Sequence, residues 1–467
     1  MFWELFVLKK IISVLLSVIT CICFWCSSVN AVTFKPSFEV YGQSVILMNL
    51  DTESIIYEKN PDMEQMPASL VNIMTAVIVL ENCQDIESET IRADKSLYQE
   101  FEDYEYQDDL RYGEIWDGDT LTVKDYLYAM MLTSSCEASK ILANYIGKGN
   151  ISAFVDKMNA KAKEIGAENT NFANPHGLYD SKQVTTARDM MKITLYALSV
   201  PGFEEIATTE EYEVNPQSYI TPHEGTWTWS HSNIITSAAS DFYLYGVKGI
   251  KTGNLVLSGR NIITMGTANG ISYMLVDLNA PFYDKDGDSK YYHVIDAYNL
   301  MDWAFDNFEF KDILSEKEEI AEVKVENSDG NGYVLVKPAK EYKTLWFNEI
   351  DVTSIQKNIN VEKTIQAPVK KGQKLGSIEM KLSDEVIATV DLVAASDVER
   401  SFVKFNMSAA KNFFKSKWIT RAFIISLILS LMYLGICIWL YVYAKKNPKG
   451  GFSNKKIVKK LYQNKRR

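Results

Sequence analysis

Three short segments of this 467-residue chain bring hydroxyl, amide, thiol and amine side chains into close spacing. Ser69 and Asn72 are three residues apart in PASLVNIMTA, a run that reads as the start of a buried helix. Ser134 and Cys136 are two apart in MLTSSCEAS, and Lys251 opens the triplet Lys-Thr-Gly in VKGIKTG. Residues at i and i+3 lie on the same face of a helix. Serine hydroxyls and a lysine amine are candidates for nucleophilic acyl transfer.

The order and content of these segments resemble the D-alanyl-D-alanine carboxypeptidases, the low-molecular-mass penicillin-binding proteins that trim peptidoglycan stem peptides. The segments FANPHGL (172–178) and VKKGQKLGSIEMKL (369–382) add to the likeness. It extends over a signal segment, a catalytic domain, a C-terminal sandwich and a membrane anchor. The expected ligands are the D-Ala-D-Ala end of a stem peptide and the β-lactams.

The resemblance also assigns roles through the motifs S-x-x-K, S-x-N and K-T-G. It makes Ser69 the nucleophile and Ser134 the residue that shuttles a proton. Lys251 and Thr252 would bind the substrate carboxylate. Gly253 completes the third motif, and the N–H groups of Asn254 and the nucleophile would form the oxyanion hole.

Two positions depart from the family pattern. Asn72 stands where the family has the S-x-x-K lysine, and an amide has no basic lone pair that could deprotonate Ser69. Cys136 stands where S-x-N has asparagine. Losing a general base typically costs about 10²–10⁴ in rate. The sequence therefore indicates a weak or non-catalytic member of the family, a pseudoenzyme that still holds a peptide carboxylate.

Alternatives to that interpretation stay open. Ser69 could act with a surrogate base such as Lys251, which would make the chain an active carboxypeptidase that removes the terminal D-Ala. Cys136 could be a replacement nucleophile, although a small apolar filler is the favoured interpretation because a thiol needs thiolate character to react. His176, in NPHGL, is interpreted as part of a structural turn. A surface sensor that signals through its basic tail is a weaker alternative.

Other classes of site are excluded by spacing. The four histidines show no H-E-x-x-H pattern, and Cys83 and Cys136 are the two cysteines outside the apolar runs near the chain ends. The G-x-x-x-x-G-K-[ST] pattern of a phosphate-binding loop is missing. We therefore expect no metal and no other cofactor.

The elements that must position these motifs follow from periodicity. Alternating strands at 38–58, helical patterns between 67 and 199, and strands again at 247–280 predict one sheet built from both ends of a domain, with helices packed on it. This pattern predicts a layered α/β (α+β) domain over residues 36–310, and the family resemblance implies that it has the penicillin-binding-protein/β-lactamase-like transpeptidase fold. A polar break is expected at Thr133–Cys136. The acidic run from Glu100 to Asp119 is expected to be a solvated loop.

Residues beyond 310 predict three further parts. Short alternating runs at 315–400 predict a small all-β sandwich, and 401–418 a juxtamembrane helix. Residues 419–444 predict a transmembrane helix, since 422–444 carry no charge and are long enough to span a bilayer. Lipid is therefore an expected partner at the C-terminus.

The two ends of the chain predict its topology. Residues 1–31 read as a secretory signal with a cleavage site after Ala31, or else as an uncleaved anchor. Residues 445–467 hold eight lysines, two arginines and no acids, which indicates a cytoplasmic tail and an external body. The whole chain carries −11, so the body is strongly acidic, and nucleic acid is not an expected ligand.

Overall fold

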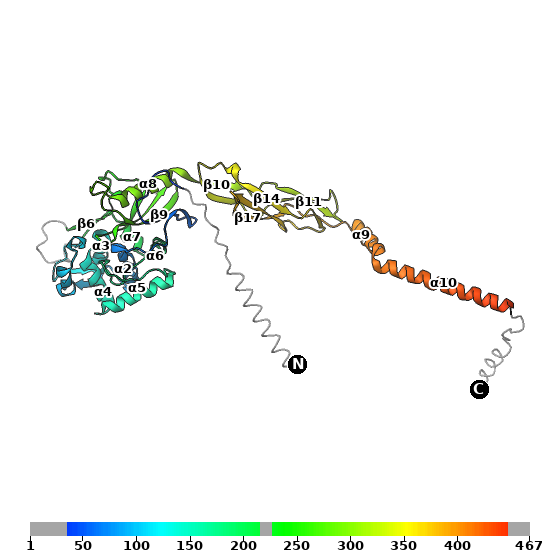
Figure 1. The fold of residues 1–467 in the computed structure, drawn as a ribbon, viewed down its shortest axis with the longest axis horizontal. Helices are drawn as coiled ribbons and strands as arrows, with labels where there is room; N and C mark the ends of the chain where they lie inside the picture. Colours follow the sequence, from blue (N-terminus) through cyan, green and yellow to red (C-terminus); the bar gives the residue numbers. More distant parts are fainter. Residues whose placement is uncertain (1–34, 215–226, 447–467) are drawn as a thin grey trace, which may run out of the picture. The chain divides into compact units, whose positions relative to one another are not determined.

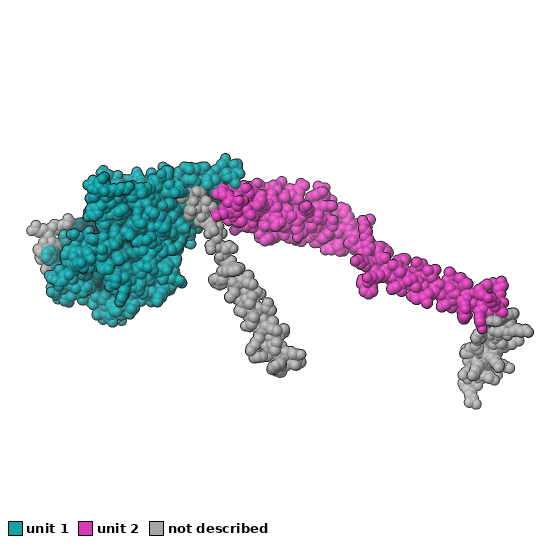
Figure 2. Space-filling view, in the orientation of Figure 1, with its two compact units in different colours: residues 1–313, 343–354 teal, residues 314–342, 355–467 magenta. Residues whose placement is uncertain are grey.

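The computed structural model describes residues 35–214 and 227–446, which form two compact units (Figures 1 and 2). Unit 1 contains Met1–Ile313 and Lys343–Ser354, and unit 2 contains Leu314–Tyr342 and Ile355–Arg467. The expected signal segment and most of the basic tail lie outside the described residues. The units are not divided at one position in the chain, because Lys343–Ser354 belongs to unit 1 although the preceding segment Leu314–Tyr342 belongs to unit 2.

Unit 1 is built around a five-stranded antiparallel sheet with the strand order β2-β1-β9-β8-β7. The strands are β1 Ser44–Asn49, β2 Ser54–Lys59, β7 Val247–Leu255, β8 Gly259–Ala268 and β9 Ile271–Ala280. Ser44 of β1 is opposite Leu278 of β9. This pairing confirms the prediction that the first and last strands of the domain share one sheet.

Alternate side chains of the sheet face two apolar layers. On β1, Val45 and Leu47 pack in the cluster under helix α8 (Tyr292–Asn307), whereas Ile46 and Met48 belong to the larger cluster around α2. Successive side chains of a strand point to opposite faces. The sheet is therefore covered on both sides, which explains why the runs Val45–Met48 of β1 and Met274–Val276 of β9 are apolar at every position.

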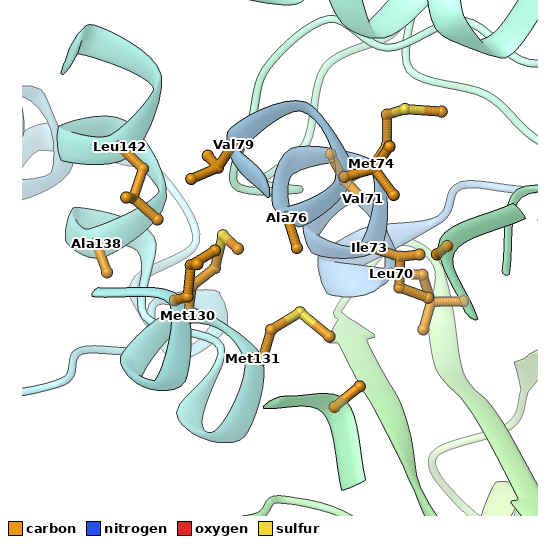
Figure 3. Packing of buried hydrophobic residues seen from close by; sticks show 14 of the residues in the cluster. Leu70, Val71, Ile73, Met74, Ala76, Val79, Met130, Met131, Ala138 and Leu142 are labelled. Carbon is orange, nitrogen blue, oxygen red and sulfur yellow. The ribbon is translucent and has the colours of Figure 1, made fainter. Parts of the chain in front are cut away.

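The larger layer is helical (Figure 1). Its helices are α2 Val71–Asn82, α3 Val123–Thr133, α4 Cys136–Ile146, α5 Ile151–Ile165, α6 Ala187–Ser199 and α7 Phe203–Thr208. Every residue of α2 from Val71 to Val79 is buried, as expected for a helix that is apolar all round. Figure 3 shows α2 facing Met130 and Met131 of α3 and Leu142 of α4. The first motif therefore begins the helix at the centre of the core.

Short elements complete unit 1. They are β3 Thr90–Arg92, β4 Thr120–Thr122, β5 Glu211–Glu213 and β6 Thr228–Ser230, with 3-10 turns at Ala68–Leu70, Lys95–Leu97, Gln99–Asp103, Gln107–Asp109, Ile234–Thr236 and Val352–Ser354. From its acidity, the chain between Glu100 and Asp119 was expected to be a solvated loop, but two of its carboxylates are buried. Asp109 and Asp119 are the buried residues. Their carboxylates accept hydrogen bonds from the backbone N–H groups of Val256 and Trp116, respectively, which compensate for lost solvation.

The predicted polar break is confirmed between α3 and α4. α3 ends at Thr133, and Ser134 adopts the left-handed conformation (φ 63°) that commonly terminates helices. The Ser135 hydroxyl then caps α4 by accepting the N–H of Ala138 at 3.0 Å. This reversal takes Ser134 out of a continuous helix and leaves Cys136 at the start of the next one.

Unit 2 contains a six-stranded sheet with the order β14-β16-β17-β12-β11-β15. The strands of the C-terminal β region are β10 Phe308–Leu314, β11 Ala321–Glu326, β12 Tyr333–Pro338, β13 Tyr342–Phe347, β14 Gln356–Val361, β15 Thr364–Gln366, β16 Lys374–Leu382 and β17 Glu385–Ala394. β10 and β13 form a separate two-stranded sheet.

Two consecutive helices follow the sandwich. They are α9 Phe402–Lys415 and α10 Lys417–Lys446. Within α10, Lys417–Tyr443 is 27 residues long and contains an 18-residue stretch with a mean hydropathy of 2.5, so it is long and apolar enough to cross a membrane. This helix is compatible with the predicted transmembrane segment.

Candidate active site

Ser69 lies in the sharp turn that precedes α2, and two glycines allow other backbone segments to approach that turn. Ala68 has a φ of 51°, an unusual value for a residue with a side chain. A Cβ on Gly177 would lie 2.2 Å from the Ala68 carbonyl oxygen, and one on Gly253 would lie 2.9 Å from the Ser69 nitrogen. The NPHGL loop and the K-T-G strand therefore both press against the Ser69 turn.

Asn72 is fully buried and is held by its own hydrogen bonds. Its Nδ2 donates to the Ser139 hydroxyl of α4 at 3.0 Å and to the Pro175 carbonyl of the NPHGL loop at 3.2 Å. Thr75, one turn further along α2, donates to the same carbonyl at 2.8 Å. The Asn72 Oδ1 has no hydrogen-bond partner among the described residues. Asn72 thus ties α2 to two neighbouring segments at the position where the family motif has its lysine.

Lys251 joins the sheet to the break between α3 and α4. Its amine donates to the Ser134 hydroxyl and to the Thr252 carbonyl, the latter at 2.9 Å. Lys251 is fully buried, and this burial lowers its pKa to about 7. A substantial fraction of its amine is therefore neutral near pH 7. The predicted residues Ser134 and Lys251 are brought together directly.

Cys136 does not have the surroundings of a nucleophile. Its side chain is buried, and its Sγ lies 3.8 Å from the Ser134 carbonyl oxygen. Burial raises its pKa to about 12, so the group stays a thiol at neutral pH. Cys83 and Cys136 are both free cysteines, and they do not form a disulfide.

The remaining K-T-G residues line the wall beside Ser69. The Thr252 and Ser232 hydroxyls lie 2.6 Å apart. Ser232 is held by its N–H, which donates to the Leu132 carbonyl at 2.9 Å. Asn254 is partly buried, and its Oδ1 has no hydrogen-bond partner among the described residues. Sequence reasoning missed Ser232, because it belongs to no motif and only the fold brings it to Thr252.

The two histidines around this site, His176 (buried) and His231 (partly buried), have lowered pKa values. Burial lowers the pKa of His176 to about 3, and the charge of Lys140 contributes. Burial, followed by the charge of Lys251, lowers the pKa of His231 to about 4. Each Nδ1 accepts a backbone N–H two residues further on, at 3.2 Å for His176 and 3.0 Å for His231. These imidazoles therefore hold turns, which agrees with the structural interpretation of NPHGL.

Within 35–214 and 227–446, no group of three or more His, Cys, Asp or Glu side chains could hold a metal ion. Near the Ser69 turn the structure instead assembles a buried amine with three hydroxyls, from Ser134, Thr252 and Ser232. An amine and hydroxyls suit recognition of a carboxylate, because all of them can donate hydrogen bonds to it.

Comparison with known proteins gives the same picture over most of the chain. The D-alanyl-D-alanine carboxypeptidase family model (Peptidase_S11) matches residues 30–282, and the penicillin-binding protein 5 C-terminal domain model matches residues 308–400.

Two curated relatives illustrate the match. D-alanyl-D-alanine carboxypeptidase DacF of Bacillus subtilis is 26% identical over 404 residues, covering 85% of this chain and 97% of the relative. D-alanyl-D-alanine carboxypeptidase DacA of Haemophilus influenzae is 27% identical over 372 residues, covering 77% of this chain and 86% of the relative.

Solved structures agree with these matches. Penicillin binding protein 5 from Haemophilus influenzae has a TM-score of 0.53 at 25% identity and covers 79% of this chain and all of its own. D-alanyl-D-alanine carboxypeptidase DacD from Francisella tularensis shares the fold, with a TM-score of 0.57 at 21% identity, covering 81% of this chain and all of its own. With its motifs in family order on this fold, the chain belongs to the D-alanyl-D-alanine carboxypeptidase family.

Proposed function

We propose that this chain binds the D-Ala-D-Ala end of peptidoglycan stem peptides and turns them over slowly or not at all. The observation that carries the proposal is the state of Asn72. Its amide is fully buried and donates to Ser139 and Pro175, so the position that needs a base is occupied by a structural hydrogen-bond donor. An amide cannot take the proton of Ser69.

Binding would use the K-T-G wall, which remains complete. A protonated Lys251 supplies a positive charge. Thr252 follows it in the chain, and the Ser232 hydroxyl lies 2.6 Å from the Thr252 hydroxyl. A buried charged group is stabilised by an opposite charge. A peptide carboxylate would therefore favour the ammonium form of Lys251, and its affinity should fall as pH rises through about 7 and above.

One observation favours a second candidate, a slow carboxypeptidase. Lys251 contacts the Ser134 hydroxyl, and its pKa of about 7 supplies neutral amine at physiological pH. A general base works best when its pKa is near the operating pH. Lys251 would then accept the Ser69 proton through Ser134, and acylation of Ser69 should increase as pH rises through about 7.

The two candidates are separated by opposite pH trends in one set of measurements. The purified full chain is incubated with a fluorescent penicillin and, separately, with a peptide ending in D-Ala-D-Ala, between pH 5.5 and 9. The first proposal expects peptide affinity that declines with pH, with near-zero labelling and no released D-Ala. The second expects labelling and release that grow with pH.

Variants identify the groups responsible. Lys251→Ala should weaken peptide binding, and Ser69→Ala should leave that binding nearly unchanged while removing any labelling. Unchanged peptide affinity in Lys251→Ala would contradict the proposed pocket. Labelling of the wild type at the rate expected of a complete S-x-x-K site would contradict the proposed lack of turnover.

We also propose that α10 anchors the chain in the membrane with the body outside the cell. The support is the length and apolar character of Lys417–Tyr443 together with the ten basic residues of 445–467. A signal segment at residues 1–31 agrees with export of the body.

A further inference from the structure

A second cavity lies in unit 2, far along the chain from the K-T-G wall. It has a volume of about 660 Å³ and lies between the loop that joins β11 to β12 and the helix α9. Three lysines and one glutamate carry the formal charges of its lining: Lys324, Lys404, Lys411 and Glu326. Because the body as a whole is acidic, a basic cavity of this kind stands out from its surroundings.

The cavity is a built feature, because α9 is fixed to the loop. The N–H of Ser401 donates to the Asn327 carbonyl at 2.8 Å, and the Lys404 amine donates to the Ser328 carbonyl at 3.0 Å. Ser401 also caps α9. These bonds hold the first turn of α9 against the loop and orient its lysines toward the cavity.

Glu326, the acidic residue of the lining, is hydrogen-bonded to the neighbouring strand β15. The Glu326 carboxylate accepts a hydrogen bond from the Gln366 amide at 2.8 Å, and the Gln366 oxygen accepts one from Asn327 at 2.8 Å. The loop itself turns through Gly330 and Gly332, both in the left-handed region, and a Cβ on Gly330 would meet nothing within 4 Å. An open backbone turn thus lies beside the three lysines of the lining.

The two faces of α9 differ sharply. Lys404, Ser408 and Lys411 follow one another at i, i+4 and i+7, and all three line the cavity. The opposite side carries large apolar residues that are exposed, with Phe402 80% and Phe413 63% exposed. A helix with a basic face and an aromatic face of this kind lies in the plane of a membrane interface, with the apolar side in the lipid.

Membrane anchorage by α10, as proposed above, would place the cavity at headgroup depth. α9 ends at Lys415, and the candidate membrane span begins at Lys417, so a single residue separates them. With the apolar side of α9 in the lipid, the opposite side and its cavity face the headgroups. Lysines near a membrane surface are each worth about 1 kcal/mol of attraction to anionic lipid.

We propose that this cavity binds the phosphate of an anionic phospholipid headgroup at the outer surface of the membrane. Lys404 and Lys411 provide the charge, and Lys324 closes the site from the sheet. The proposal rests on membrane anchorage by α10 but is independent of the chemistry at Ser69. Free phosphate is the other source of the same ligand chemistry, and the experiment distinguishes the two.

The test uses the purified full chain in a non-ionic detergent, so that binding is measured without requiring insertion of α10. Short-chain phosphatidylglycerol, short-chain phosphatidylcholine, glycerol phosphate and inorganic phosphate are titrated separately, and bound ligand is counted by native mass spectrometry. We expect saturable binding of phosphatidylglycerol above that of the other three. Lys404→Gln/Lys411→Gln should weaken it by roughly fivefold for each lysine removed.

Matched controls keep the result decisive. Lys340→Gln/Lys371→Gln removes the same charge from two exposed turns outside the cavity and should bind as the wild type does. Lys411→Gln alone leaves the Lys404–Ser328 bond in place and serves if the double variant misfolds.

Equal binding by the cavity variants and the wild type would overturn the proposal. Equal affinity for glycerol phosphate and phosphatidylglycerol would overturn the lipid as ligand. Alkaline extraction of membranes tests the anchorage of α10 separately.

Discussion

At the scale of single residues, Asn72 is a fully buried amide at the position where the family motif has its lysine. Its amide fills a buried position lined by the Ser139 hydroxyl and the Pro175 carbonyl, both of which can also accept from an amine. The position therefore offers hydrogen-bond acceptors that a lysine introduced there could use. The second departure, Cys136, lies at the start of α4, so a test of the site changes both positions.

Asn72→Lys is expected to raise acylation by a fluorescent penicillin above the near-zero level of the wild type. The restored base should be worth about 10²–10⁴ in rate once Cys136→Asn is added, and the two gains should not be additive because such groups act together. Ser69→Ala in the same background should abolish the gain. A folded double variant with no gain would show that more than these two positions separates the site from an active one.

A pair of buried carboxyl groups provides a second test at this scale. Asp296 accepts the N–H groups of Tyr41 and Gly42 at 2.7 and 2.8 Å. Burial raises the pKa of Asp296 to about 6, and burial and the charge of Asp296 raise the pKa of Asp277 well above its usual value. The pair therefore binds protons more tightly in the folded state than in the unfolded state.

The sign of the resulting pH dependence follows from that difference. The pair's contribution to stability is present at acidic pH and is lost as pH rises through about 6 and above. Thermal unfolding at pH 5 and pH 8 should show a larger loss of stability with pH in the wild type than in Asp277→Asn. Parallel curves for the two proteins would contradict the assignment.

At the scale of elements, the turn before α2 depends on segments that are distant in sequence. Gly177 has a φ of 87° and leaves its loop close against the Ala68 carbonyl, while Gly166 has a φ of 81° at the end of α5 with nothing within 4 Å of its Cβ position. The two glycines have nearly the same backbone conformation. They differ in what surrounds them, so they form a matched pair for substitution.

Gly166→Ala should cost only the left-handed conformation, about 1–2 kcal/mol of unfolding free energy. Gly177→Ala should cost more and should also lower the affinity for a D-Ala-D-Ala peptide, because the new methyl group displaces the Ala68–Ser69 backbone. Chemical denaturation and peptide titration measure the two effects. Equal losses of stability with unchanged peptide affinity would mean that the loop does not position the turn.

The arrangement of the elements could be predicted from the sequence, whereas the polar contacts between distant segments could not, for physical reasons. The shared sheet and the break at Thr133–Cys136 follow from local periodicity and polarity, and both are confirmed. The burial of Asp109 depends on a single N–H of Val256, which lies 147 residues away. The contact of Ser232 with Thr252 likewise depends on tertiary packing. Local patterns carry no information about such long-range polar contacts.

At the scale of the whole molecule, anchorage and orientation are expectations that one experiment can check. Protease added to intact cells should degrade the body and leave the segment 445–467 protected, because the basic tail is expected inside. Antibodies against each part distinguish the fragments, and permeabilised cells provide the control. Loss of the tail with survival of the body would reverse the topology.

The return of Lys343–Ser354 to unit 1 has a consequence for what a protease could release from an anchored chain. A protease that cuts once in the exposed segment 315–319, just after β10, leaves a downstream fragment that still contributes β13 to the two-stranded sheet with β10. Phe347 of that fragment stays packed in the apolar cluster under α8. The nicked halves should remain associated, so shedding of the body requires a cut beyond Ser354 or unfolding of unit 1.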